Sequence, residues 1–333
     1  MARSLGRGGQ AMPILAYHSV SPEGRYRSPT IAVHPQSFDR QMAYLARHYQ
    51  VVPLDQVVTC IAERKPFPSR AVAITFDDGY MDNYACAYPI LKKYGLTATF
   101  FITAGPVVRG QRFWVSWVHE AIEGAKHLAG LLRDGAVPGL EDINATDSRE
   151  QVIAEVTTRL NRMGCSARAE ALARLAKVLS LHVPEEPGSS GLGIMMGPEQ
   201  VRDMSLGGMS IGSHTVTHPN LPRLTAKELD HELRESKALL EAVTGTSVEH
   251  LAYPGGPEVT NPDFTDQVAE AVRQAGYRSA CNSIRGVVSL NDQLFTLRRH
   301  DVSDHDGFSG FVFKLERHRL GPLFAPPVHV HQH

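Results

Sequence analysis

Short β-rich runs alternate with longer helical patterns along most of this 333-residue chain, and this alternation constrains the fold more than any other feature. It predicts a parallel sheet covered by helices, either open or closed into a barrel. We expect strands at residues 13–17, 50–54, 71–76, 97–102, 209–213, 250–253, 277–281 and 294–299, and helices at 35–48, 82–94, 151–178, 225–243 and 263–275. The helix at 225–243 carries a capping box at its start, Thr225 followed by Glu228.

One segment, 106–197, interrupts the alternation. It opens near "RFWVSWVHEAI", continues with a helical pattern and passes through the Pro/Gly/Ser-rich stretch "VPEEPGSSGLG". We expect a mainly helical insertion between two strands of the sheet, and it is a candidate lid. The expected organisation is therefore one domain over 12–305, with this insertion inside it, followed by a C-terminal tail at 306–333.

Composition excludes several classes of protein. The net charge of -1, with 21% charged residues, gives no reason to expect nucleic acid or an anionic membrane as a partner. No window approaches the roughly 20 apolar residues of a membrane span. The basic N-terminus has a short apolar run broken by Pro13 and His18, which is unlike a signal peptide, so we expect a cytoplasmic protein. The oligomeric state is left open.

Polar residues follow several of the expected strands, at the end where barrels carry their chemistry. Asp77 and Asp78 follow "AVAITF", His18 follows "PILAY", and His214 and His218 lie in the loop-like stretch "SHTVTH". Two imidazoles and one carboxylate leave open positions on a divalent metal, as a catalytic site requires. The second aspartate would then take a proton from the attacking water. Structural or surface histidines are the alternative.

Three motifs carry a resemblance to a known family. "TFDDGY", "SHTVTH" and "LAYPGGP" resemble successive motifs of the NodB-homology polysaccharide deacetylases, carbohydrate esterase family four. The resemblance implies a distorted (β/α)7 barrel. It also implies that Asp77 is the general base and that Asp78, His214 and His218 hold the metal, usually zinc, with cobalt or nickel in related enzymes. The insertion and the tail are outside the resemblance.

The third motif departs from the family pattern R-P-P-Y-G, because Ala252 stands where the base-orienting arginine is expected. Arg299 in "LFTLRRHDV" is the candidate replacement, with Arg298 second, and a surface arginine is the alternative. Backbone N–H groups in this tract could donate to a developing oxyanion. The candidates for oxyanion and substrate contact are Tyr253, Pro254 and Gly255, with Gly255 first, and a simple tight turn is the alternative.

The general acid is the second departure. The family's leucine-x-histidine motif is missing after residue 300. Instead, "PILAYHSV" resembles the opening strand of the circularly permuted exopolysaccharide and poly-N-acetylglucosamine deacetylase branch, which implies that His18 is the acid. A structural histidine on an apolar strand is the alternative.

The expected activity is metal-dependent hydrolysis of the N-acetyl group of an amino sugar in a polysaccharide, glycolipid or glycan precursor, with release of acetate. Trp114 and Trp117, near the start of the insertion, are candidates for stacking on a sugar ring, or else core residues of the insertion. A hydrolase of a non-sugar amide on the same barrel is one alternative. A catalytically silent carbohydrate-binding protein is another.

Overall fold

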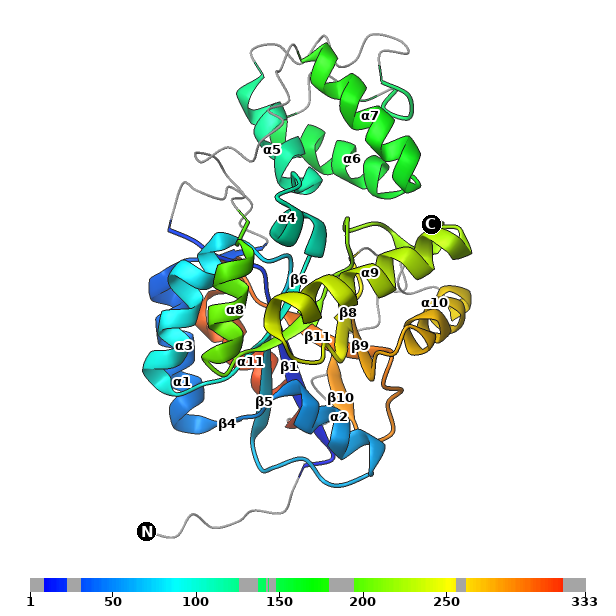
Figure 1. Ribbon diagram of the computed structural model, residues 1–333. Coiled ribbons are helices and arrows are strands. Elements are labelled where there is room, and N and C mark those ends of the chain that lie inside the picture. The colour runs from blue at the N-terminus through cyan, green and yellow to red at the C-terminus, as the bar shows by residue number, and fades with distance from the viewer. Residues whose placement is uncertain are drawn as a thin grey trace.

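The computed structural model describes residues 9–22, 31–125, 137–141, 143, 148–179, 195–255 and 262–319. Within these residues, seven parallel strands form a closed barrel, which confirms the predicted fold class (Figure 1). In order around the ring they are β1 (Ala11–Tyr17), β5 (Ala71–Phe76), β6 (Thr99–Ile102), β7 (Ser210–Ser213), β8 (His250–Ala252), β9 (Ser279–Arg285) and β11 (Leu297–Asp301).

The first strand of the chain closes the ring. β1 pairs in parallel with β5 on one side and with β11 on the other, so Leu15 lies opposite both Ile74 and His300. The N-terminal strand therefore completes the barrel beside the last one, as the position of His18 required. Short strands extend this sheet: β4 (Gln50–Val51) on β5 and β10 (Val287–Ser289), antiparallel, on β1. β2 (Ser19–Val20) and β3 (Ala32–Val33) form a separate pair.

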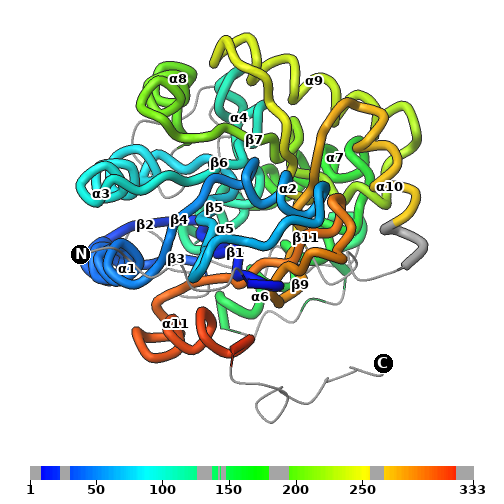
Figure 2. The backbone as a smooth tube through the Cα atoms, turned by 90° about the horizontal axis from the view of Figure 1, so that it is seen from below, coloured from blue at the N-terminus to red at the C-terminus, as the bar shows by residue number. Residues whose placement is uncertain are grey.

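Helices surround the strands, as Figure 2 shows for α1 (Pro35–His48), α3 (Tyr88–Tyr94), α8 (Pro198–Leu206), α9 (Ala226–Thr244), α10 (Pro262–Gln274) and α11 (Gly307–Glu316). The predicted capping box starts α9. The Thr225 side chain accepts from the backbone N–H of Glu228, and the Glu228 carboxylate accepts from the backbone N–H of Thr225. Gly245, at φ 69°, ends this helix in the left-handed conformation that glycine adopts without steric cost.

Side chains alternate between two apolar layers along each strand. Leu15 and Ile74 pack outward against the helices, whereas Ile14, Ala73 and Leu297 fill the barrel interior. Helix α2 (Leu54–Ala62) packs its apolar residues into the same interior cluster. Further along the strands, the inward positions are polar, and they carry the candidate site.

The structure corrects three expectations. The strand predicted at 50–54 ends at Val51, and α2 begins after Pro53, because proline suits the start of a helix. The single helix predicted at 151–178 is two, α6 (Arg149–Asn161) and α7 (Cys165–Val178), with Gly164 as the N-cap of the second. Residues 307–316, predicted as tail, form α11, which buries Phe311 and packs on α1. Residues 320–333 lie outside the described residues.

The insertion is helical and stands at the carboxyl end of the barrel (Figure 1). After α4 (Ala104–Arg109), its helices α5 (Trp114–Gly124), α6 and α7 share an apolar core of their own. Val118, Val156 and Leu175 are fully buried there. Among the helices of the described residues, none has both the length and the apolar composition that a membrane crossing needs.

Candidate active site

Five side chains predicted from separate parts of the sequence meet at the carboxyl end of the barrel. Asp77 and Asp78 follow β5, His18 follows β1, and His214 and His218 follow β7. Asp78 Oδ1 lies 3.5 Å from Nε2 of His214 and 3.5 Å from Nε2 of His218. Asp77 and His18 lie directly beside this group.

The three predicted ligand atoms have the spacing of one metal site, since all lie within 4.8 Å of one another. Bonds of about 2 Å in a tetrahedral arrangement separate their ligand atoms by roughly 3.5 Å. Two of the ligand residues have left-handed backbones, Asp78 at φ 74° and His218 at φ 54°. A non-glycine residue adopts that conformation only where surrounding contacts enforce it, and such positions concentrate at functional sites.

The protonation of the site suits a divalent cation. Nδ1 of His214 lies 2.8 Å from the Ala252 carbonyl, which only accepts, so Nδ1 carries a proton and Nε2 faces Asp78. Burial alone would lower the pKa of His214, but Asp78 and Asp77 raise it above its ordinary value, so a cation bound there would displace a proton from Nε2. Burial, with the neighbouring His214, lowers the pKa of His218 to about 3, so that imidazole is neutral. Burial alone would raise the pKa of Asp78, but the histidines lower it below its ordinary value. The donor set is thus two imidazoles and one anion.

Asp77 makes a two-point ion pair with Arg299 from β11. Nη1–Oδ1 and Nη2–Oδ2 are both 2.7 Å, and Arg299 also donates to the Thr75 hydroxyl and the Asn282 carbonyl. Burial alone would raise the pKa of Asp77, but the Arg299 charge holds it well below its usual range. Arg299 therefore contacts Asp77, as predicted, from a strand other than the one where the family pattern places its arginine.

His18 lies on the open side of Asp77, with its Nε2 4.0 Å from Oδ2 of that residue and its side chain 24% exposed. Its backbone carbonyl accepts from Asn83 Nδ2 at 2.7 Å. Asp82 accepts in turn from the Ser19 hydroxyl and binds Asn83. Sequence reasoning missed this Asp82–Asn83 pair, which lies at the start of a short π-helix after the "TFDDGY" motif and fixes the turn bearing His18.

The oxyanion candidates have unequal surroundings. Tyr253 is buried, its N–H donates to the Cys281 carbonyl, and its hydroxyl donates to the Phe295 carbonyl at 3.0 Å. Pro254 has no N–H. The exposed Gly255 is the next residue with an amide to offer, so it stays the first candidate. Gly256 lies outside the described residues.

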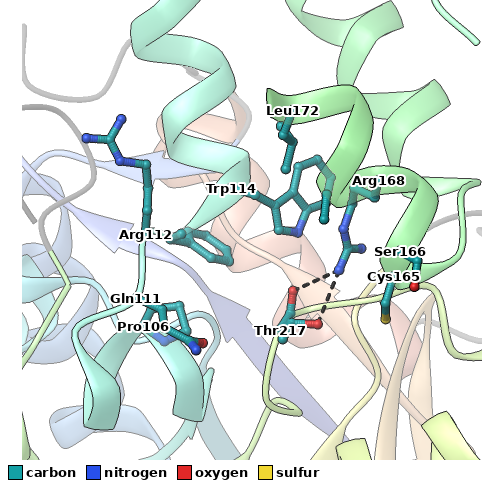
Figure 3. A pocket seen from close by; sticks show the side chains of 11 residues that line it. Pro106, Gln111, Arg112, Trp114, Cys165, Ser166, Arg168, Leu172 and Thr217 are labelled. Carbon is teal, nitrogen blue, oxygen red and sulfur yellow. Dashed lines mark hydrogen bonds between the residues drawn. The ribbon is translucent and has the colours of Figure 1, made fainter. Parts of the chain in front are cut away.

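The two tryptophans do not form an open platform on which a sugar ring could stack. Trp117 and Trp114 are only 5% and 7% exposed, and both belong to the core of the insertion, which was the alternative to sugar stacking. Trp114 donates its indole N–H to the His218 carbonyl at 3.3 Å. It also lines a pocket of about 410 Å³ with Arg168 and Thr217, between the insertion and the barrel (Figure 3).

Sequence reasoning also missed Glu232 on α9. This buried carboxylate accepts from the backbone N–H groups of Val216 and Thr217, at 2.7 and 3.0 Å, and from the Thr217 hydroxyl at 2.6 Å. It therefore anchors the loop that connects His214 to His218. A detectable signal existed, because Glu232 occupies the apolar face of α9 between Leu229 and Leu233.

Several known proteins resemble this chain in sequence. Residues 64–280 match the sequence model of the family described as polysaccharide deacetylase. The Bacillus subtilis (strain 168) protein YxkH, named as a polysaccharide deacetylase, is 25% identical over 303 residues, which are 91% of this chain and 74% of that protein. The poly-beta-1,6-N-acetyl-D-glucosamine N-deacetylase of Staphylococcus aureus (strain MSSA476) is 37% identical over 76 residues, 23% of this chain and 26% of that enzyme.

Two solved structures share the fold. The Streptococcus pyogenes deacetylase PplD, in complex with acetate, aligns with a TM-score of 0.60 at 20% identity, covering 92% of this chain and 98% of that one. IcaB from Ammonifex degensii aligns with a TM-score of 0.57 at 18% identity, covering 92% and 98%. At these identities the likeness concerns the fold.

Proposed function

Because this chain belongs to the polysaccharide deacetylase family, we propose that it is a metal-dependent enzyme that hydrolyses the N-acetyl group of an amino sugar and releases acetate. The substrate would be a polysaccharide, a glycolipid or a glycan precursor. The observation that carries the proposal is the meeting of a two-histidine, one-aspartate ligand set with a second, arginine-paired aspartate at the carboxyl end of the barrel. The short match to the Staphylococcus aureus enzyme supports an N-acetylglucosamine unit as substrate.

Asp78, His214 and His218 would hold the metal, for which zinc is the first candidate and cobalt or nickel are alternatives. A divalent cation bound there would polarise the acetyl carbonyl and lower the pKa of the attacking water. The ligand residues are prepared for this role, because the Ala252 carbonyl fixes the tautomer of His214 and burial keeps His218 neutral.

Asp77 would act as the general base that takes the proton from the attacking water. Its carboxylate is ionised at neutral pH because Arg299 lowers its pKa, and the two-point ion pair fixes the direction of both oxygens. Each oxygen keeps a further lone pair for the incoming proton. Arg299 would thus orient the base without touching the substrate.

His18 would act as the general acid. An amide nitrogen leaves poorly unless it is protonated as the C–N bond breaks, and histidine exchanges protons readily near neutral pH. The side chain is partly exposed and lies 4.0 Å from Asp77, so acid and base share one site. The amide of Gly255 is the first candidate donor to the oxyanion of the tetrahedral intermediate.

The proposal is tested by incubating the metal-loaded protein with N-acetylglucosamine oligomers and, separately, with small cyclic amides. We expect a mass decrease equal to one acetyl group per reacted sugar, with an Asp77→Asn variant as the inactive control. Hydrolysis of the cyclic amides but not of the oligomers would indicate that the substrate is a non-sugar amide. Binding of the oligomers without any turnover would indicate a carbohydrate-binding protein. The cytoplasmic location predicted from the sequence stays a prediction, for which cell fractionation is the measurement.

A further inference from the structure

The loop that carries His218 has an unfavourable backbone. Thr215 lies at φ 67° and His218 at φ 54°, although neither is glycine. A β-branched threonine with positive φ is a marked outlier. One hydrogen bond within the loop supports this shape, because the His218 N–H donates to the Thr215 hydroxyl at 3.1 Å. Contacts from outside the loop add to it.

His218 also lacks the hydrogen bond that orients His214. Nδ1 of His214 binds the Ala252 carbonyl, whereas Nδ1 of His218 is buried and has no hydrogen-bond partner among the described residues. The direction of its Nε2 is therefore set by the position of its backbone and by packing on its ring. The His214 ring of the barrel packs on one part of it, with the ring centroids 4.9 Å apart. The insertion supplies further packing, since the ring of Phe113 meets the His218 ring edge-on at 5.4 Å and Trp114 lies at 6.4 Å.

Arg168, on α7 of the insertion, holds this backbone directly. Its guanidinium donates to the carbonyl of His218 at 3.3 Å. It also donates to the carbonyl and the hydroxyl of Thr217, at 3.2 Å each (Figure 3). The guanidinium lies 4.9 Å above the ring of Trp114, whose indole N–H shares the His218 carbonyl. Arg168 is only 4% exposed, so water competes little with these hydrogen bonds.

Thr217 connects the insertion to the barrel. Its hydroxyl donates to Glu232 of α9 at 2.6 Å and accepts from Arg168 of α7 at 3.2 Å. A buried guanidinium and a buried carboxylate thus bind the same residue from opposite sides. A buried charge is costly unless it is hydrogen-bonded and balanced, and here each one has its partner across the loop.

We propose that the insertion completes the metal site, with Arg168 as a positioning residue that holds His218 in the direction required for metal binding. This inference rests on the proposed function, because it takes His218 to be a metal ligand. The insertion would then support a metal ligand, in addition to being a candidate lid. Partners of ligand residues commonly change metal affinity by about 10–100-fold when they are removed.

The test compares three variants of the full chain: Arg168→Ala, Arg168→Lys and, as a matched control, Arg174→Ala. Arg174 lies on the same helix but is solvent-exposed and pairs with Glu170, four residues earlier on that helix. Dissociation constants for Zn²⁺ come from competition with a chromophoric chelator, and the visible spectrum of bound Co²⁺ reports ligand geometry. We expect Arg168→Ala to weaken zinc binding by about 10-fold or more and to change the cobalt spectrum. Arg168→Lys should recover part of the affinity, and Arg174→Ala should match the wild type.

A wild-type dissociation constant and cobalt spectrum in Arg168→Ala would overturn the inference. If that variant does not fold, Trp114→Phe and Thr217→Val replace it. Trp114→Phe removes the N–H that donates to the His218 carbonyl and keeps an aromatic ring, and Thr217→Val removes the hydroxyl that accepts from Arg168 and keeps the branched shape. Unchanged zinc binding in both would also overturn the inference. If the wild-type chain binds no divalent cation, the proposed function and this inference both fail. If the wild type binds metal and releases acetate, but Arg168→Ala leaves zinc binding and the cobalt spectrum unchanged, only the inference fails.

Discussion

Arg299 and Asp77 lie 222 positions apart in the chain, and they meet in a two-point ion pair in which Nη1–Oδ1 and Nη2–Oδ2 are both 2.7 Å. Both side chains are about 95% buried, and they occupy the inward positions of β11 and of the turn after β5. Below them the same inward rows hold Leu297 and Ala73, which fill the apolar interior. The Asp77–Arg299 pair thus occupies the same inward rows of side chains that fill the barrel.

Replacing Arg299 by alanine should lower both stability and turnover. The change leaves the Asp77 carboxylate buried without its partner, which typically costs about 3–5 kcal/mol in the free energy of unfolding. The metal ligands are untouched, so metal content should remain. Arg298→Ala is the control, because that neighbouring side chain is exposed and should change stability by less than about 0.5 kcal/mol. Urea denaturation and acetate release measure the two effects, and equal stability of both variants would show that the ion pair has no structural role.

The two adjacent aspartates should separate by metal content. Asp77→Asn should keep the metal and lose about 10²–10⁴-fold in turnover, the usual contribution of a general base. Asp78→Asn should lose metal, because Oδ1 of Asp78 lies 3.5 Å from Nε2 of both His214 and His218, whereas the Asp77 carboxylate faces Arg299. Metal analysis of the purified variants distinguishes the roles. Loss of metal from Asp77→Asn with retention in Asp78→Asn would mean that the roles are exchanged.

His18→Gln should retain metal and lower turnover, since the side chain lies beside Asp77 but outside the ligand set. If His18 protonates the leaving nitrogen, the alkaline limb of the pH–rate profile belongs to it, and that limb should disappear in the variant. Steady-state rates across the pH range make the measurement. An unchanged, bell-shaped profile in His18→Gln would assign the acid to another group.

Acid should destabilise the fold through His300. Burial, with the cationic side chains of Arg317 and Lys314, lowers the pKa of His300 to about 4 in the folded chain. The unfolded chain takes up this proton near pH 6.5, so the free energy of unfolding falls as the pH is lowered from about 6.5 to about 4. His300→Gln should make this decline shallower, as measured by urea denaturation at pH 7 and pH 5. An identical decline in the variant would exclude His300 as its source.

Much of the barrel could be predicted because its strands are marked locally. The run at 71–76 is an apolar β-former stretch bounded by polar residues, and β5 has those same bounds. Motif resemblance then assigned the acids and histidines at the ends of such strands, and the structure brings them to one place. Helix α2 was missed because Val57 and Val58 resemble strand residues, and packing into the barrel interior outweighs that local preference.

The supports of the site were harder to predict, since they are contacts between distant segments. Arg168 and Glu232 read as surface charges on amphipathic helices. Their positions carried a signal, however, because each lies on the buried face of its helix, Arg168 with Ala171 and Leu175, and Glu232 with Leu229 and Leu233. A charge on an apolar face requires a buried partner, but only the fold identifies that partner as Thr217.

If one metal ion and Asp77 together remove acetyl groups from an amino sugar, acetate release should depend on the metal content of the protein. Protein stripped with a chelator and dialysed is assayed on N-acetylglucosamine oligomers during stepwise addition of Zn²⁺, with acetate and newly formed primary amine both quantified. We expect no turnover without metal, recovery that saturates at about one ion per chain, and equal amounts of acetate and amine. Acetate release that persists in the stripped protein, or that continues in Asp77→Asn at the wild-type rate, would contradict this expectation.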